Sequence, residues 1–135
     1  MPTNKELAIQ IEDRPGTLGK LCRTLADKGV NILAFQASQS PGNNLLRLVV
    51  DNPTAAEKVL VTERASYTKT EVAQVKLPNR PGELARAASQ LGDAKININY
   101  AYCGLDPGTN APLVIFGVKE AGQAATILDR IAAAA

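Results

Sequence analysis

The sequence has no histidine, no tryptophan and only two cysteines. Histidine is the commonest general base, the usual partner of a nucleophilic serine or cysteine, and the commonest metal ligand. Its absence argues against most acid–base, nucleophilic and metal-dependent enzymes. Cys22 and Cys103 lie far apart with no paired spacing. This pattern is typical of buried or half-buried free thiols rather than a metal site or a redox pair, so we expect neither a metal nor a cofactor.

Aromatic side chains and an excess of one charge are also scarce. Phe, Trp and Tyr make up 4% of the chain, and fifteen Lys and Arg oppose thirteen Asp and Glu for a net charge of +2. The basic residues are scattered along the chain. The stacking platforms and the basic surface typical of nucleic-acid-binding proteins are therefore missing, and we expect no nucleic-acid partner.

Long apolar runs are missing as well. No stretch approaches the roughly 20 residues that a membrane-spanning helix needs. The segment Met1–Glu6 is polar and lacks the apolar core of a secretion signal. We expect a cytoplasmic location and no membrane partner. The 45% of apolar residues is the ordinary balance of a globular protein, and 135 residues allow one ordinary domain or two very small ones.

An internal repeat decides between these two possibilities. A shift that places Asp13–Gly16 on Asn79–Gly82 gives the pairs Asp-Arg-Pro-Gly and Asn-Arg-Pro-Gly. The match continues without a gap until Asn31-Ile32 falls on Asn97-Ile98. A repeat of this length in a short chain indicates two copies of one supersecondary unit.

Each copy predicts the order strand, helix, strand, strand, helix. Alternating apolar and polar residues before Arg-Pro-Gly predict a strand with one buried face, and apolar residues three and four apart after it predict an amphipathic helix. Pro15 and Pro81 are expected in the first turns of these helices, and Lys28-Gly29 is expected to stop the first of them. Second strands are expected to begin at Asn31 and Asn97. The remaining segments are the first strands Leu7–Ile11 and Ala73–Leu77, the first helices Leu18–Leu25 and Leu84–Leu91, the third strands Leu45–Val50 and Leu113–Val118, and the second helices Ala56–Leu60 and Ala124–Ile131.

The links between the copies complete the fold prediction. Roughly ten residues, Glu63–Glu71, leave room for a fourth strand that runs into the next copy. The second copy ends in four alanines after Ile131, so we expect its fourth strand to be missing or supplied by a partner. The order βαββαβ is that of the ferredoxin-like fold, in the α+β class. We predict two tandem domains, residues 1–70 and 71–135, with their antiparallel sheets side by side.

The repeated motif, a strand followed by Asp/Asn-Arg-Pro-Gly-x-Leu, an amphipathic helix and Asn-Ile, resembles the ACT domain over nearly the whole chain. The second copy is similar to the version in the regulatory domains of phosphoglycerate dehydrogenases. The resemblance implies a non-catalytic sensor that binds a free amino acid between two domains. It also implies contacts from the turn of one copy and the second strand of the other, which pairs Asn79 with Asn31 and Asp13 with Asn97.

The candidate ligand-binding residues follow from this resemblance. They are Asp13, Arg14, Pro15, Gly16, Thr17, Leu18, Asn31 and Ile32 in the first copy, and Asn79, Arg80, Pro81, Gly82, Glu83, Leu84, Asn97 and Ile98 in the second. The dehydrogenase version also carries a histidine two residues before the turn asparagine. Ile11 and Leu77 hold that position here, which argues against serine as the ligand.

Elementary chemistry supports the same turns. A helix N-terminus offers free N–H groups and the positive end of a dipole, which suits a carboxylate. Glycine permits close approach of the backbone, and asparagine can bridge the ammonium and carboxylate of one ligand. We expect unequal affinities at the two sites, because Asp13 can face a ligand ammonium whereas Glu83 is expected to point to solvent. Arg14 and Arg80 are expected to be exposed or paired with carboxylates.

Several of these residues also fit purely structural roles. Asp13 and Asn79 could cap helices, and Asn31 could sit in a tight turn after a helix, as could its counterpart in the second copy. Tyr100 and Tyr102 lie two apart on one face of a strand, which is more typical of packing than of a ligand cage.

Two other function classes stay open. A hydrolase of the acylphosphatase type would use Arg14 with Asn31, although the glycine-rich phosphate loop of such enzymes is absent. An interaction module would control a metabolic enzyme without holding a ligand. The third strands Leu45–Val50 and Leu113–Val118 are apolar on nearly both faces and need cover, so we also expect a homodimer.

Overall fold

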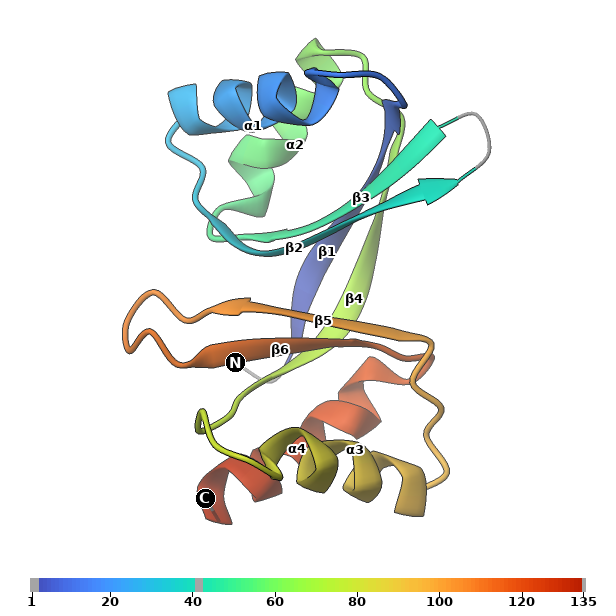
Figure 1. Ribbon diagram of the computed structural model, residues 1–135, viewed down its shortest axis with the longest axis vertical. Helices are drawn as coiled ribbons and strands as arrows, with labels where there is room; N and C mark the ends of the chain where they lie inside the picture. The colour runs from blue at the N-terminus through green and yellow to red at the C-terminus, as the bar shows by residue number, and fades with distance from the viewer. Residues whose placement is uncertain (1–2, 41–42, 135) are drawn as a thin grey trace. The chain divides into compact units, whose positions relative to one another are not determined.

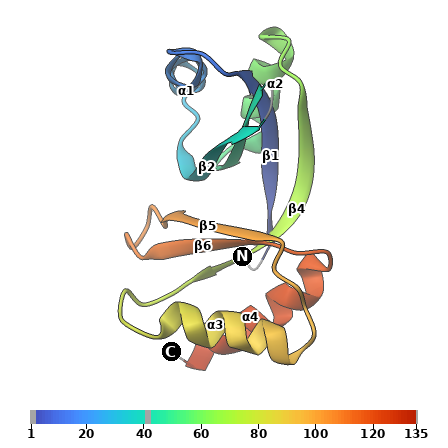
Figure 2. The same cartoon turned by 45° about the vertical axis from the view of Figure 1, so that its right-hand side comes forward.

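The computed structural model describes residues 3–40 and 43–134. The chain forms two compact units, one comprising Lys5–Thr70 and the other Met1–Asn4 together with Glu71–Ala135. In each unit two helices pack on one face of an antiparallel sheet (Figures 1 and 2). This α+β arrangement is the predicted ferredoxin-like one. None of the helices in the described ranges is both long enough and apolar enough to cross a membrane.

The Lys5–Thr70 unit follows the predicted order. Its elements are β1 (Thr3–Glu12), α1 (Thr17–Asp27), β2 (Ile32–Ser40), β3 (Asn43–Val50), α2 (Pro53–Thr62) and the start of β4 (Tyr67–Lys76). β3 pairs antiparallel with both β1 and β2. Alternate strand residues such as Leu7 and Leu48 meet Leu25 and Leu60 of the helices in one buried cluster. The apolar residues that repeat every two positions in the strands and every 3.6 in the helices therefore form one core.

The second unit repeats this plan. It contains the end of β4, then α3 (Glu83–Asp93), β5 (Tyr100–Leu105), β6 (Pro112–Gly117) and α4 (Ala121–Ala134). β6 pairs antiparallel with β4 and β5. Val75 and Phe116 from the sheet pack with Leu91 and Leu128 from the helices. The third strand begins and ends one residue earlier than predicted. The second strand begins at Tyr100 rather than Asn97, after Lys95 adopts a positive φ of 64°.

The turns before α1 and α3 are built on glycine. Gly16 and Gly82 are the N-cap residues, with φ of 90° and 89°, and no side chain caps either helix. Glycine is the residue that adopts this left-handed conformation without steric cost. The helix-capping interpretation of Asp13 and Asn79 is therefore wrong. The prolines precede the caps rather than opening the helices, whereas the predicted stop of α1 at Lys28 and Gly29 is confirmed.

β4 is one uninterrupted strand, so the predicted fourth strand of the first copy does run into the first strand of the second. After β6 the described chain forms α4 as far as Ala134 and adds no further strand there. Beside β4 in this unit lies instead the start of β1, where Asn4 Nδ2 donates to Gln74 Oε1 at 3.2 Å. The start of β1 thus belongs to this unit and contacts β4 through Asn4.

Candidate functional site

The second Arg-Pro-Gly turn leads directly from β4 into α3. The Arg80 N–H donates to the Pro78 carbonyl at 3.0 Å, and the Arg86 N–H donates to Gly82 at 2.9 Å as an early bond of the helix. Because no side chain caps α3, the N–H groups of its first turn donate no hydrogen bond to a capping side chain. Gly82 has no neighbouring atom within 4 Å of where a Cβ would lie, so the turn is open to an approaching group.

A pocket of about 380 Å³ opens beside this turn. The end of β4, the turn and the start of α3 line it with Leu77, Pro78, Asn79, Arg80, Glu83 and Leu84. The sheet supplies Ala101, Tyr102 and Cys103 from β5, and Pro112 and Val114 from β6. The sequence motif predicted the turn residues of this pocket. It did not predict the walls from β5 and β6.

Glu83 is buried and does not point to solvent, so that prediction is wrong. Its side-chain oxygens accept from Arg80 Nε and from Arg86 Nη2, both at 2.7 Å. The hydrogen bonds from Arg86 and Arg80 lower the pKa of the Glu83 carboxyl and so keep it ionised. Arg86 also donates through Nη1 to the Ile131 carbonyl of α4 at 3.2 Å, which ties the turn to the last helix.

We expect replacing Glu83 with glutamine to lower the stability of the protein at neutral pH. The depressed pKa means that the contribution of the carboxylate is fully present above the ordinary glutamate pKa of 4.5. It is lost as the pH falls through the lower folded-state value. In urea unfolding, the difference between Glu83→Gln and wild type should therefore be clear at pH 7 and shrink below pH 4.5. Glu63→Gln, at an exposed position, is the control. A pH-independent difference would contradict the assigned role.

The first turn is more polar than the second. Asp13 Oδ2 accepts from Gln39 Nε2 of β2 at 2.7 Å, and Thr17 Oγ1 donates to the Glu12 carbonyl at 2.8 Å. Arg14 forms an ion pair with the exposed Glu12, whereas the glutamate paired with Arg80 is the buried Glu83. Both arginines were expected to be exposed or paired with carboxylates, and each is both.

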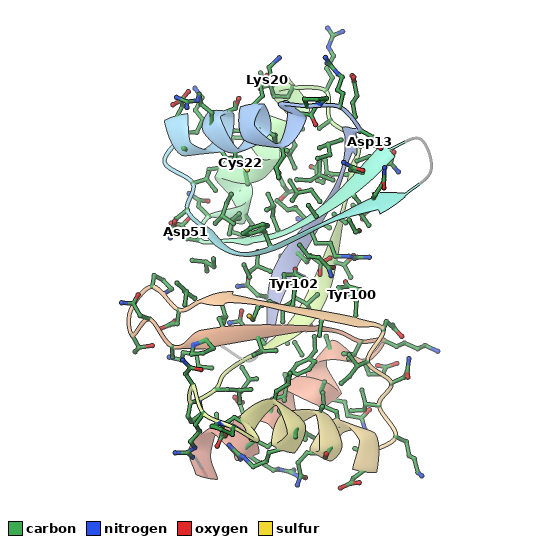
Figure 3. The ribbon with its side chains drawn as sticks, in the orientation of Figure 1. Asp13, Lys20, Cys22, Asp51, Tyr100 and Tyr102 are labelled. Carbon is green, nitrogen blue, oxygen red and sulfur yellow. The ribbon has the colours of Figure 1, made fainter. Side chains whose placement is uncertain are left out.

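Within each unit, the turn and the Asn-Ile sequence lie at opposite ends. Figure 3 shows Asp13 at one end of the Lys5–Thr70 sheet and Asp51 at the other. The Asn31 N–H donates to Asp51 Oδ1 at 2.9 Å, whereas Gln39 reaches Asp13. At about 3.3 Å per residue, Asn31 and Gln39 are roughly 26 Å apart along β2. Arg14 and Asn31 therefore cannot form one hydrolase site in this unit.

Asn97 lines a separate cavity of about 470 Å³ in the second unit. Lys95, Asn99 and Lys119 share its wall, and Asn97 Nδ2 donates to Asn99 Oδ1 at 2.9 Å. No residue of this cavity lines the pocket beside Asn79. The turn and the Asn-Ile sequence of the second unit therefore line different cavities.

The remaining candidates divide into exposed turn residues and core residues. Pro15 and Pro81 are exposed. Leu18, Ile32 and Ile98 are partly buried and pack against the cores of their own units. Leu84, in contrast, is 55% exposed.

The two tyrosines of β5 pack on each other, as expected. The Tyr100 and Tyr102 rings are stacked, with centroids 6.4 Å apart and planes within 5° (Figure 3). The Tyr100 ring also covers Gly117, where a Cβ would lie 2.1 Å from it. Glycine at this position is therefore a packing requirement.

The cysteines differ in environment. Cys22 is half-buried, and its burial raises the pKa of the thiol, whereas Cys103 is exposed, contrary to the expectation that both would be covered. Over residues 3–40 and 43–134, no cluster of three or more His, Cys, Asp or Glu side chains is placed to hold a metal ion.

The sequence matches the family of the ACT domain pair over residues 2–132. The chain belongs to the ACT domain family. The match extends across both units and includes both Arg-Pro-Gly turns. The ferredoxin-like fold predicted from the repeat is the fold of this family.

Individual relatives agree with this assignment. D-3-phosphoglycerate dehydrogenase of Methanocaldococcus jannaschii is 41% identical over 49 residues, which cover 36% of this chain but only 9% of that protein. Protein BT0572 of Bacteroides thetaiotaomicron has a similar structure, with a TM-score of 0.83 and 25% identity over 95% of this chain and 88% of that one. The regulatory subunit of aspartate kinase from Thermus thermophilus shares the fold, with a TM-score of 0.64 and 18% identity over 96% and 92% of the two chains.

Proposed function

We propose that this ACT domain pair is a non-catalytic regulatory protein that binds a free amino acid. The observation that carries the proposal is the pocket of about 380 Å³ beside the uncapped N-terminus of α3. It lies in the second ACT domain, against the turn that the repeat singles out.

The chemistry of a zwitterion fits these parts. The ligand carboxylate would accept from N–H groups in the first turn of α3, where the helix dipole favours a negative charge. Gly82 allows that approach because it carries no side chain. The exposed amide of Asn79 has both donors and acceptors and can hold the carboxylate or the ammonium.

The cross-copy arrangement stays a prediction. It pairs Asn79 with Asn31 in one site and Asp13 with Asn97 in the other. Its support is the family resemblance and the separation of turn and Asn-Ile sequence within each unit. The homodimer and a metabolic enzyme as the regulated partner are likewise predictions.

Titration calorimetry with each of the twenty amino acids tests the proposal. An amino acid that binds should also raise the unfolding free energy by about 2.7 kcal/mol at 100 times its Kd. We expect Asn79→Ala to weaken this binding by about 1.5–3 kcal/mol, the range for a hydrogen bond to a charged group. Gln10→Ala, which removes an exposed amide on β1, should leave the affinity unchanged.

The single variants Asp13→Ala, Asn31→Ala and Asn97→Ala extend the test to the pairing. If Asn31→Ala affects the same binding event as Asn79→Ala, and the other two share a second event, the cross-copy sites are supported. If none of the four variants changes an affinity by even about 1 kcal/mol, the site is assigned wrongly. If no amino acid binds, the protein is instead a ligand-free interaction module.

A further inference from the structure

The pocket beside the second turn has mostly apolar walls. Apart from Asn79, Arg80 and Glu83, its lining residues are aliphatic residues, prolines, a tyrosine and a cysteine. Leu77 and Val114 are 3% and 8% exposed and belong to the core of the unit. The volume of about 380 Å³ lies within the usual range for small-molecule sites.

The two charged side chains in the wall, Arg80 and Glu83, form an ion pair with each other. Glu83 is held between Arg80 and Arg86 by hydrogen bonds of 2.7 Å, so its carboxylate is already partnered. Arg80 in turn donates a hydrogen bond through its Nε–H to that carboxylate. A charged ligand side chain entering the pocket would lose part of its hydration and would have to compete with these ion pairs for a counter-charge, which is costly.

The first copy differs at the same places. By the register of the two hairpins, Asn44 of β3 occupies the place of Pro112 in β6, and Thr17 occupies the place of Glu83. The Asn44 Oδ1 atom is buried and accepts no hydrogen bond. The first copy thus has the polar side chains of Asn44 and Thr17 where the second has apolar Pro112 and the ion-paired carboxylate of Glu83.

We infer that the second turn binds an amino acid with an apolar side chain, which enters the pocket between Leu77 and Val114. The inference rests on the proposed function, since the carboxylate is taken to stay at the N-terminus of α3. The apolar wall then selects the side chain, because an amide or a charge placed against Leu77, Pro112 and Val114 would find no polar side chain among them.

Calorimetry with pairs of similar shape tests this selectivity. We expect leucine to bind at least 100-fold more tightly than asparagine, and valine about 10- to 100-fold more tightly than threonine. Lysine and aspartate should give no measurable heat. Equal or tighter binding of asparagine, threonine or a charged amino acid overturns the inference but leaves the proposed function standing. Failure of every amino acid to bind overturns both.

Variants of the wall place the selectivity in this pocket. Pro112→Asn introduces the residue of the first copy and should lower leucine affinity at least tenfold, whereas the same change at exposed Pro107 in the β5–β6 turn should not. If Pro112→Asn prevents folding, Cys103→Asp decides, because Cys103 is exposed and its replacement leaves the core intact. It should also lower leucine affinity at least tenfold. Unchanged leucine affinity in the folded variants overturns the inference.

Discussion

Phe116→Ala is expected to destabilise the protein by about 3–5 kcal/mol, the usual cost of removing a buried phenylalanine side chain. Phe116 is 1% exposed and lies one residue before the end of β6. Ala73 and Ala101 are its neighbours on the two adjacent strands. These small neighbours cannot fill the cavity left behind, so little of the lost packing can be recovered. Urea unfolding with a two-state fit measures the effect.

The other phenylalanine of the chain provides a matched control. Phe35 on β2 is 57% exposed, so Phe35→Ala should change the unfolding free energy by no more than about 0.5 kcal/mol. Similar losses in the two variants would mean that β6 does not form the core of its unit. If the two units unfold separately, the Phe116 variant should shift only one of two transitions.

Gly117→Ala is expected to displace the Tyr100 ring and to cost about 1–3 kcal/mol, the usual range for overpacking. The new Cβ would lie 2.1 Å from the ring, closer than any contact distance. The ring must turn away, which separates it from Tyr102. Two of the three tyrosines belong to this stack and the chain has no tryptophan, so near-ultraviolet circular dichroism should report the change directly.

Gly122→Ala is the matched control for this prediction. A Cβ at Gly122 in α4 meets no atom within 4 Å, and alanine is the better helix former. This variant should be unchanged or slightly more stable, with the same near-ultraviolet spectrum as wild type. An unaltered tyrosine spectrum in Gly117→Ala would show that the ring does not rest on the glycine.

Local patterns predicted most of the fold. The alternation in β1, the stripe Leu21 and Leu25 of α1 and the Lys28-Gly29 stop are all carried by neighbouring residues, and the structure has them where expected. The start of β5 was misplaced. By its place in the repeat, Asn97 is expected to begin the strand. In the structure, however, Lys95 has a positive φ and the strand begins only at Tyr100.

The candidate site was predicted less completely, for physical reasons. The turn is encoded locally, by proline and glycine. The orientation of Glu83 depends on arginines three residues before and after it, a spacing that favours such contacts at a helix start and that the sequence does display. The walls from β5 and β6 depend on strand pairing, which the motif does not contain.

The start of β1 has a consequence for how the chain can be divided. Asn4 belongs with the residues from Glu71 onward, and β4 passes without a break from one unit into the other. A cut at residue 70 would split a strand and leave the second fragment with the bare edge of β4, a template for aggregation. The sequence contains two repeats, but the unit of the second repeat also includes residues that precede the first. A binding study of the second turn alone would therefore have to graft the first residues of the chain back onto the fragment.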